Sequence, residues 1–271
     1  MSETTMTGSA ASASPSDEDA IIRVRGLTTR FGPQVVHDGL DLTVRKGEVL
    51  GVVGGSGTGK SVLMRTIIGL NQAAAGTIAV FGQVRGKLEP AGGRAREQRG
   101  GVLLQGGALF SSRPVAENVQ APMREHADLP RALMDELAGL KIAIVGLPHD
   151  ACAKFPSELS GGMRKRAGLA RALALDPEIV FLDEPTAGLD PVGAAAFDIL
   201  IRELSDTLGL TVVMITHDLD SLYAICDRVA VLAERKVLTV APIAELERNP
   251  HPWLQSYFHG PRARAARQAR Q

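Results

Sequence analysis

The feature that most constrains this chain is a glycine-rich run that lies between two apolar segments. The run consists of Gly54, Gly55, Ser56, Gly57, Thr58, Gly59, Lys60 and Ser61. It matches the G-x-x-x-x-G-K-S pattern of phosphate-binding loops, in which glycines let several backbone N–H groups converge on one phosphate. Residues 48–53 before the run have the apolar, β-branched content of a buried strand, and residues 61–70 after it carry apolar side chains at helical spacing. Strand, loop and helix therefore follow one another in the order that the motif requires.

The same run predicts how a polyphosphate would be bound. Its end coincides with the start of the predicted helix, where unpaired N–H groups and the helix dipole favour anions. In this motif the ammonium group of Lys60 reaches the β- and γ-phosphates, and the hydroxyl of Ser61 coordinates Mg²⁺. The alternative is a glycine-rich turn that happens to end in Lys-Ser, and the flanking strand and helix argue against it.

Composition narrows the class of protein. The 271 residues include 30 basic and 30 acidic side chains, so the net charge of zero gives no general attraction to nucleic acid or to anionic membranes. A hydrophobic content of 45% supports the core of one large domain or two small ones. Cys152 and Cys226 lack metal-ligand spacing, which favours a reduced intracellular compartment. Because the sequence contains no signal peptide and no apolar run near the roughly 18 residues of a membrane span, we expect a cytoplasmic protein.

The pattern of the chain predicts one folded domain and two tails. Residues 1–19 contain almost no large apolar side chains and are predicted to be a disordered N-terminal tail. The domain is predicted at residues 20–258, and residues 259–271 form a basic C-terminal tail. A solvated tail is the default interpretation, with contact to a partner or a lipid surface as the alternative. Within the domain, the arginines of residues 85–100 lack interleaved aromatics and favour a solvated surface over a nucleic-acid patch.

Alternating apolar and polar residues at 22–25 and 40–44 predict two half-buried strands of an antiparallel unit ahead of the phosphate loop. Between these strands, Phe31 precedes a glycine. An aromatic side chain at this place could stack on an adenine, or it could be a core or turn phenylalanine, and the sequence leaves both open. Residues 228–240 are predicted to form a closing hairpin.

Three predicted buried strands end in polar side chains. The residues at their ends are Gln105, Asp183, Glu184 and His217. In a parallel α/β sheet, ligands bind outside the carboxyl ends of the strands, so a shared site is favoured. Behind a phosphate loop, Asp183 would hold Mg²⁺ through water, and Glu184 would orient and polarise an attacking water. A lone histidine is usually structural, and the neighbouring strand ends are what make His217 a candidate site residue.

A second anion-binding helix start lies far along the chain from the first. Residues after Gly106 become alanine-rich and helical, which predicts a helical subdomain at about residues 106–165, inserted into the α/β core. Ser160 is placed to cap a further helix, with Gly161 and Gly162 preceding its first turn. A single chain has no evident reason to contain two such sites.

With these residues in view, the chain resembles the nucleotide-binding subunit of an ABC transporter from about residue 22 to residue 258. The matching motifs are Walker A at Gly54–Ser61, the Q-loop at Gln105, the signature at Leu159–Met163, the end of Walker B at Asp183 and Glu184, the D-loop at Ala187–Asp190, the switch histidine at His217 and the adenine-stacking aromatic at Phe31. The resemblance implies the ABC ATPase fold, which is an α/β P-loop NTPase (RecA-like) core with an antiparallel β subdomain and an inserted α-helical subdomain.

The resemblance also implies a mechanism and partners. ATP and Mg²⁺ would be the cofactors, with Gln105 in contact with the Mg²⁺ or the attacking water. Two copies would form a homodimer, in which each ATP lies between the Walker A loop of one subunit and the Ser160–Gly162 segment of the other. Hydrolysis through Glu184, with His217 sensing the γ-phosphate, would open the dimer. A permease docked near residues 106–125 would convert this motion into transport.

A narrower resemblance is visible as well. The segments that carry it are residues 101–112, 117–119 and 122–125. They are similar to the ATPase subunit of Mla-type phospholipid transporters, which work with MCE-domain proteins. Met163 in place of glutamine agrees with that subgroup. Two features depart from it, because Leu104 and Gly106 flank the Q-loop glutamine and the hairpin at 233–236 lacks a turn glycine.

We therefore expect an ATP-hydrolysing subunit that powers phospholipid transport, held at the inner face of the cell membrane by its permease and without a nucleic-acid partner. An importer of amino acids or another small solute is the main alternative. A soluble ABC ATPase that remodels a ribosome, DNA or a metal cluster is another, although this chain shows neither a second cassette nor a long coiled coil. A P-loop kinase or other NTPase would leave the glycines after Ser160 unexplained.

Overall fold

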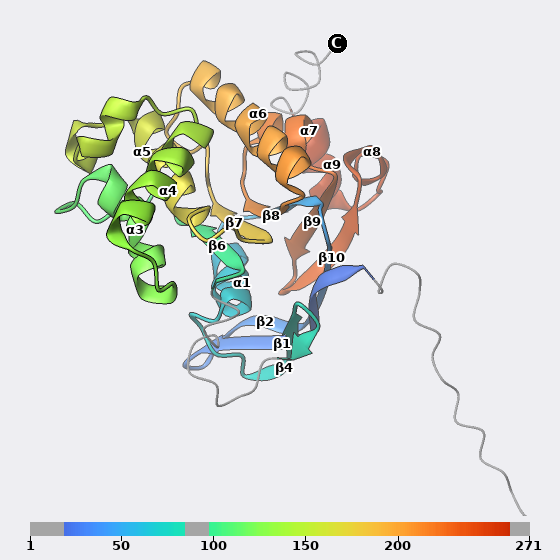
Figure 1. Ribbon diagram of the computed structural model, residues 1–271. Helices are drawn as coiled ribbons and strands as arrows, with labels where there is room; N and C mark the ends of the chain where they lie inside the picture. Colours follow the sequence, from blue (N-terminus) through green and yellow to red (C-terminus); the bar gives the residue numbers. More distant parts are fainter. Residues whose placement is uncertain (1–18, 85–97, 261–271) are drawn as a thin grey trace, which may run out of the picture.

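The computed structural model describes residues 19–84 and 98–260 (Figure 1). The predicted tails at 1–19 and 259–271, apart from their innermost residues, lie outside the described residues, as does most of the arginine-rich segment at 85–100. In the described part of the chain, no helix is long and apolar enough to cross a membrane.

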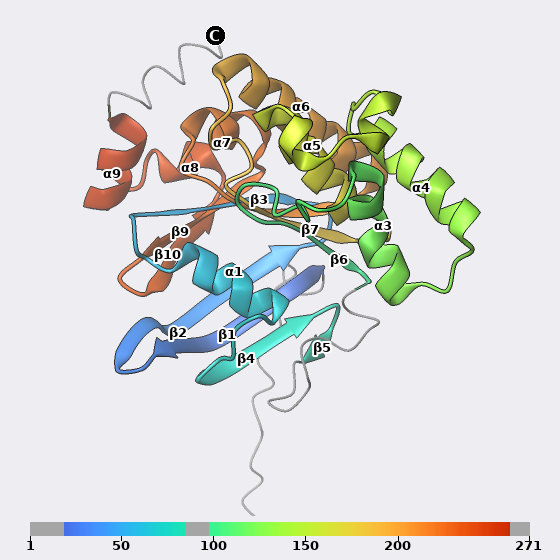
Figure 2. The same ribbon diagram turned by 90° about the vertical axis from the view of Figure 1, so that its left-hand side faces the viewer.

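The first sheet is antiparallel and lies at one side of the molecule (Figures 1 and 2). Its strands in the described residues are β1 (Ala20–Phe31), β2 (Gln34–Arg45), β4 (Ala75–Val80) and β5 (Gln83–Val84), in the order β2-β1-β4-β5. Apolar side chains that alternate along β1, such as Ile22 and Val24, are fully buried, because successive side chains of a strand point to opposite faces. The predicted antiparallel unit ahead of the phosphate loop is therefore confirmed.

The second sheet contains the predicted buried strands. In the described residues they are β3 (Val49–Gly54), β6 (Gly100–Leu103), β7 (Ile179–Asp183), β8 (Thr211–Ile215), β9 (Arg228–Ala233) and β10 (Lys236–Ala241), in the order β10-β9-β3-β8-β7-β6. Neighbouring strands are parallel except for β9 and β10, which form the predicted closing hairpin. Every residue of β7 and β8 is buried, as expected for strands covered on both faces. The strand order places the carboxyl ends of β3, β8, β7 and β6 next to one another at one edge.

Helices of the described residues cover both faces of the second sheet and form a lobe beside it. They are α1 (Lys60–Ile68), α3 (Val115–His126), α4 (Arg131–Ile144), α5 (Gly161–Ala172), α6 (Pro191–Leu208), α7 (Leu219–Ile225), α8 (Ile243–Leu246) and α9 (Pro252–His259), with short 3-10 turns at His149–Ala153 and Pro156–Glu158. α1 lies between the two sheets, whereas α6 and α7 cover the opposite face of the second sheet (Figures 1 and 2). α3 and α4 form a helical lobe to one side.

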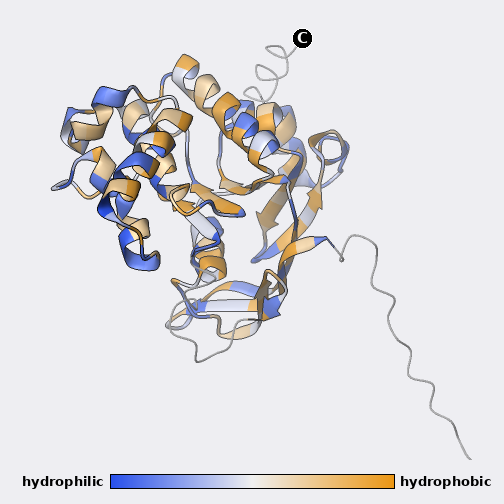
Figure 3. Ribbon diagram, in the orientation of Figure 1, coloured by the Kyte–Doolittle hydropathy of each residue, from blue (hydrophilic) through white to orange (hydrophobic). Residues whose placement is uncertain are grey.

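The apolar core follows this layering. Figure 3 shows apolar residues concentrated in the strands of the second sheet. One buried cluster joins α1 to both sheets, with Leu63, Met64 and Ile67 contributed by the helix. A second cluster continues from the strands into the helical lobe, where it includes Val119 and Met123 of α3. The helical lobe therefore shares its core with the rest of the molecule.

α5 crosses the position where the helical subdomain was predicted to end. The helix is continuous from Gly161 to Ala172, so residue 165 lies inside it. It approaches β6 so closely that a Cβ atom at Gly168 would lie 2.6 Å from Leu103 Cδ1. A change in composition along the chain marks where helices begin, but it does not reveal which layer a helix packs against.

The β9–β10 hairpin closes without a glycine. Glu234 and Arg235 adopt φ angles of 51° and 65°, the left-handed conformations that a tight hairpin turn requires. The carbonyl oxygen of Arg235 accepts a hydrogen bond from the backbone N–H of Asp38 at 3.0 Å, which ties the turn to β2. This contact between the two sheets helps to offset the strain of left-handed residues that carry a Cβ atom.

Candidate active site

The glycine-rich loop is held between β3 and α1. Two of its glycines are required sterically, because a Cβ atom at Gly54 would lie 2.5 Å from Leu232 O and one at Gly59 would lie 2.5 Å from Val36 Cγ1. Gly59 also precedes α1 in a left-handed conformation, with a φ of 95°. α1 therefore begins at Lys60, and its unpaired N–H groups lie at the loop, as the sequence predicts.

The ammonium group of Lys60 is bound by its own loop. Its Nζ donates hydrogen bonds to the carbonyl oxygens of Gly54 at 2.9 Å and Gly55 at 3.0 Å. Burial lowers the pKa of Lys60, while the carboxylates of Glu184 and Asp183 act in the opposite direction. A flexible ammonium bound to carbonyl oxygens can exchange them for phosphate oxygens without building a new site.

Ser61 and Asp183 meet beside the loop. The Ser61 hydroxyl donates to Asp183 Oδ1 at 3.2 Å, and Asp183 is only 4% exposed. Burial is the main cause that raises the pKa of Asp183, and the neighbouring Glu184 raises it further. Hydroxyl and carboxylate oxygens are ligands that Mg²⁺ accepts. Among the described residues, no group of three or more His, Cys, Asp or Glu side chains could hold a metal ion.

The side chains of Glu184 and His217 meet just beyond the ends of two adjacent strands. His217 Nδ1 lies 2.8 Å from Glu184 Oε2. Glu184 follows β7 in a left-handed conformation with a φ of 51°, and its N–H donates to Ile215 O at 2.9 Å. Left-handed residues other than glycine are strained, and such residues are concentrated at functional sites. The structure thus brings together the carboxylate and the imidazole that the sequence placed at two separate strand ends.

Gln105 lies just after the end of the third predicted strand. It lies in an exposed turn after β6, and β6 pairs with β7, so the third predicted strand end belongs to the same edge. Gly106 and Gly107 follow with φ angles of 78° and 84°. A Cβ atom at Gly107 would lie 3.0 Å from Arg164 O, so this turn runs directly against α5. The position of Gln105 is therefore coupled to the helix that begins at Ser160.

The helix start at Ser160 has the predicted cap. Ser160 Oγ accepts a hydrogen bond from the backbone N–H of Met163 at 3.2 Å. Gly161 and Gly162 form the first turn of α5, and do not precede it as predicted, because helical geometry begins directly after the cap. Among the described residues, no hydrogen bond or ion pair joins this helix start to the loop at Gly54–Ser61. The two helix starts for which the sequence predicts anion binding are thus not joined to each other by these contacts.

Phe31 ends β1 at the surface. Its side chain is 52% exposed, and the residue is paired with Gln34 across the β1–β2 turn. Of the alternative, a core or turn phenylalanine, the core position is wrong because half of the residue is accessible, whereas the position beside a turn agrees with the structure. Contact with an adenine stays a prediction.

Sequence reasoning missed Lys165. This residue of α5 is 5% exposed, and its Nζ donates to the backbone carbonyl of Glu184 at 2.8 Å. Burial lowers the pKa of Lys165, while Glu184 and Asp183 raise it. A lysine between Arg164 and Arg166 is typical of a solvated helix face, so the sequence carried no signal for its burial. Lys165 supports the strained turn that presents the Glu184 carboxylate.

Comparison with known proteins agrees with this geometry. The family model described as ABC transporter matches residues 37–187. The chain belongs to the ABC transporter family. It is 39% identical over 218 residues to the intermembrane phospholipid transport system ATP-binding protein MlaF of Haemophilus influenzae, covering 80% of this chain and 82% of the relative. It is 36% identical to MlaF of Escherichia coli K12 over 89% of both chains. It is also 38% identical to the probable ribonucleotide transport ATP-binding protein mkl of Mycobacterium tuberculosis, over 89% of this chain and 67% of the relative.

Solved structures agree on the fold. CbiO1 of Clostridium perfringens, described as part of the ABC transporter complex cbiONQ, superposes with a TM-score of 0.77 at 27% identity, covering 93% of this chain and 100% of that chain. The ATP-binding cassette MJ0796 superposes with a TM-score of 0.75 at 24% identity, covering 82% of this chain and 98% of that chain. The predicted fold class and the assignment of this chain as an ATPase are confirmed.

Proposed function

We propose that this ATPase powers a membrane permease that moves phospholipid. The observation that carries the ATPase chemistry is the Glu184–His217 pair, 2.8 Å apart, at the same sheet edge as the phosphate loop. The cargo is supported by the two MlaF relatives, which match over at least four-fifths of this chain and are named for intermembrane phospholipid transport. The mkl relative is named for ribonucleotide transport, which is a second candidate cargo.

ATP is bound by the loop between β3 and α1. The N–H groups at the start of α1 receive the phosphates, and Lys60 Nζ moves from the carbonyl oxygens of Gly54 and Gly55 to the β- and γ-phosphates. Ser61 and Asp183 would hold Mg²⁺, with Gln105 as a further oxygen ligand. The ion supplies positive charge that neutralises the phosphate oxygens. Phe31, exposed at the end of β1, offers a ring on which the adenine stacks.

Hydrolysis requires Glu184 to be released from His217. When the imidazole turns to the γ-phosphate, Glu184 Oε2 is free to accept a hydrogen bond from a water molecule and to take its proton as the water attacks. Lys165 holds the carbonyl group of Glu184 and thereby fixes the direction of the carboxylate. The three groups therefore have separate roles, in which the histidine senses phosphate, the glutamate orients water and the lysine supports the turn.

Two copies of the chain form the working unit. Ser160 and Gly161 at the start of α5 are exposed, and among the described residues no hydrogen bond or ion pair joins them to the phosphate loop of their own chain. A second copy can place this helix start against the γ-phosphate, which gives each ATP two anion-binding helix ends. The relative MJ0796 was solved as a dimer, which agrees with this arrangement.

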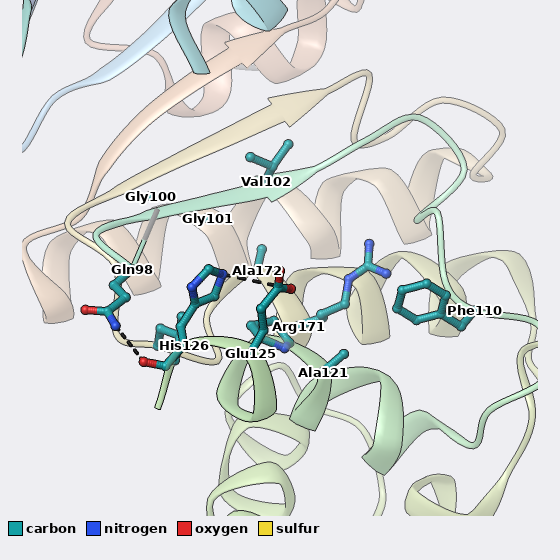
Figure 4. A pocket seen from close by; sticks show the side chains of 12 residues that line it. Gln98, Gly100, Gly101, Val102, Phe110, Ala121, Glu125, His126, Arg171 and Ala172 are labelled. Atoms are coloured by element: carbon teal, nitrogen blue, oxygen red, sulfur yellow. Dashed lines mark hydrogen bonds and ion pairs between the residues drawn. The ribbon is translucent and has the colours of Figure 1, made fainter. Parts of the chain in front are cut away.

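The permease would dock at the segment 106–125. A pocket of about 270 Å³ lies there between β6, α3 and α5, and Figure 4 shows Phe110 and Arg171 toward one end, Gln98 and His126 at the other, and Glu125 between them. Phe110 is 50% exposed, with the guanidinium groups of Arg113 and Arg171 at 5.3 Å and 5.9 Å from its ring. Val115 and Val119 of α3, which lie in the same segment, are fully buried in the core and are not accessible to a partner. Such a pocket fits a short helix with one apolar side chain.

The same pocket is connected to the nucleotide site. Arg171 donates hydrogen bonds to Ala108 O at 2.8 Å and Gly107 O at 3.1 Å, and these residues follow Gln105. A helix that presses on Phe110 would therefore shift the turn that carries Gln105. The permease would keep this chain at the inner face of the membrane, and an MCE-domain protein would be its further partner.

Reconstitution tests the cargo. The complex with its permease should transfer labelled phospholipid between vesicles when ATP is added, and the same complex with Lys60→Ala should not. Phospholipid should also change the ATPase rate of the detergent-purified complex. An ATPase rate that responds to ribonucleotides, or to an amino acid with its binding protein, and not to lipid would overturn the phospholipid cargo and leave the ATPase chemistry intact.

A further inference from the structure

A buried polar cluster lies close to the sheet edge that carries Glu184 and His217. None of its residues is among those proposed to bind or hydrolyse the nucleotide. The cluster joins Asp198 of α6, Ser221 of α7 and Thr186 of the loop after β7, whose exposed fractions are 3%, 0% and 5%. The Ser221 hydroxyl donates to Asp198 Oδ2 at 2.8 Å. The Ser221 oxygen also lies 3.4 Å from Thr186 Oγ1 and 3.4 Å from Asp218 Oδ2. In both views α6 and α7 lie side by side over the second sheet (Figures 1 and 2).

Two residues that contact Ser221 are close in sequence to Glu184 and His217. Thr186 lies in the turn that follows Glu184. Asp218 directly follows His217 and is the N-cap of α7. Ser221 lies in the first turn of α7 and contacts both Thr186 and Asp218. A shift of α7 relative to α6 would therefore move the His217 imidazole relative to the Glu184 carboxylate.

The Asp198 carboxylate is buried with only one of its two oxygens hydrogen-bonded among the described residues. Its Oδ1 is buried and, within residues 19–84 and 98–260, has no hydrogen-bond partner. Burial raises the pKa of Asp198 to about 6, with further increases from Asp218 and Asp220 at the start of α7 and a partial decrease from Ser221. From the end of α7 the Cys226 thiol also faces this carboxylate, and its own pKa is raised chiefly by burial. A buried carboxylate that is only half satisfied is unfavourable for folding, so a stabilising role does not explain it.

We propose that Asp198 is a positioning residue for ATP hydrolysis, which accepts the Ser221 hydrogen bond, fixes the first turn of α7 and so sets the position from which His217 turns from Glu184 to the γ-phosphate. The proposal rests on the hydrolytic roles of Glu184 and His217 given above. ATP itself is bound by the loop between β3 and α1, so loss of the Asp198 contact should slow hydrolysis without weakening ATP binding. Protonation of Asp198 replaces a charged acceptor by a weaker neutral one, so the contact should weaken as the pH falls through about 6.

Steady-state ATPase kinetics of Ser221→Ala and Asp198→Ala test this role. Each substitution should lower kcat roughly 10- to 100-fold and leave KM for ATP within about twofold, because His217 is misplaced relative to the γ-phosphate while the phosphate loop is intact. The double variant should be no worse than the more severe single variant, since both remove the same hydrogen bond. The matched control is Ser205→Ala, which removes an α6 hydroxyl that is 3% exposed and donates to Leu210 O at 2.8 Å. Its kcat should stay within about twofold of wild type.

The pH profile separates positioning from a general loss of stability. Wild-type kcat should fall as the pH drops through about 6. Asp198→Asn keeps an acceptor oxygen for Ser221 but cannot ionise, so it should retain most of kcat at pH 7.5 and lose this acid limb. An acid limb unchanged in Asp198→Asn, additive losses in the double variant, or an equal loss in Ser205→Ala would overturn the proposal.

A comparison with Glu184→Gln separates a failure of the role proposed for Asp198 from a failure of the hydrolytic role proposed for Glu184. If Glu184→Gln is stalled while Asp198→Ala and Ser221→Ala retain the wild-type kcat, only the role of Asp198 is wrong. If Glu184→Gln hydrolyses ATP at the wild-type rate, the hydrolytic assignment itself is wrong.

Discussion

The Nδ1 atom of His217 lies 2.8 Å from Oε2 of Glu184, and this contact joins the ends of two strands that are adjacent in the sheet. The His217 side chain is 68% exposed, whereas the Glu184 side chain is only 16% exposed. The imidazole can therefore turn toward a bound γ-phosphate while the carboxylate stays in place. Binding of ATP is thus expected to break this pair. The distance between His217 and Glu184 would then report whether ATP is bound.

Substitutions of Lys60 and of Glu184 should impair different steps of the ATPase cycle. Lys60→Ala should weaken ATP binding and abolish hydrolysis, because it removes the charge that meets the β- and γ-phosphates. Glu184→Gln should bind ATP and stall, because the amide cannot take a proton from water. Binding of a fluorescent ATP analogue and release of phosphate measure the two steps separately. Turnover of Glu184→Gln near the wild-type rate would contradict the assigned role.

Lys165→Met should slow hydrolysis without affecting nucleotide affinity. The substitution keeps an unbranched side chain but removes the ammonium that donates to Glu184 O at 2.8 Å, so the strained turn loses its support. We expect kcat to fall about tenfold, as for the loss of one charged hydrogen bond. Lys154→Met is the control, since Lys154 only pairs with the exposed Asp150 at 2.6 Å. Equal losses in both variants, or a loss of ATP affinity in Lys165→Met, would refute this role.

Asp198→Asn should stabilise the folded protein in a manner that depends on pH. Folding raises the pKa of Asp198 from 3.8 to about 6, so the folded state is disfavoured relative to the unfolded state as the pH rises from 4 through 6. The amide removes this penalty, and the gain in free energy of unfolding should grow over that range to at most about 3 kcal/mol. Urea unfolding at pH 5 and pH 8 measures it. Asp206→Asn, on the exposed part of α6, is the control, and a gain of equal size at both pH values would disprove the assignment.

Mixed dimers should reveal the composite site. Ser160→Arg should block the helix start that meets ATP across the dimer, and Lys60→Ala should disable the phosphate loop. Mixing the two inactive chains should restore at most one intact site per dimer, because each partner supplies what the other lacks. ATPase activity of the isolated wild-type subunit should also rise faster than linearly with its concentration. Linear activity from a monomer, confirmed by light scattering at nanomolar protein, is incompatible with this arrangement.

Cysteine at Ser112 should crosslink to the permease. Ser112 is exposed and close in sequence to Phe110 in the docking segment. In intact membranes a crosslinker should join it to a small integral membrane protein, and ATP with vanadate should change the yield because the pocket is connected to the turn after Gln105. Cysteine at Lys236, on the distant β10 strand, is the control and should not form this product. Crosslinks only to ribosomal or DNA-bound proteins would overturn the transport function.

The sequence predicted the parts of the site that local chemistry encodes. The spacing of Gly54–Ser61, the cap at Ser160 and the polar ends of three apolar runs each depend on residues close together in the chain. A glycine turn, a helix cap and a buried strand are short-range structures, so their patterns can be recognised without knowledge of the rest of the fold.

By itself, then, the sequence located the glycine-rich loop at Gly54–Ser61, the capped helix start at Ser160 and the strands that end near Gln105, Glu184 and His217. Only the tertiary structure decided that these strands are neighbours, that His217 lies against Glu184, and that Lys165 and Asp198 are buried. The reason is physical. Lateral strand order and helix burial arise from packing between segments far apart in the chain, and a lone charged residue on a helix is assigned to solvent until a second layer is known to cover it.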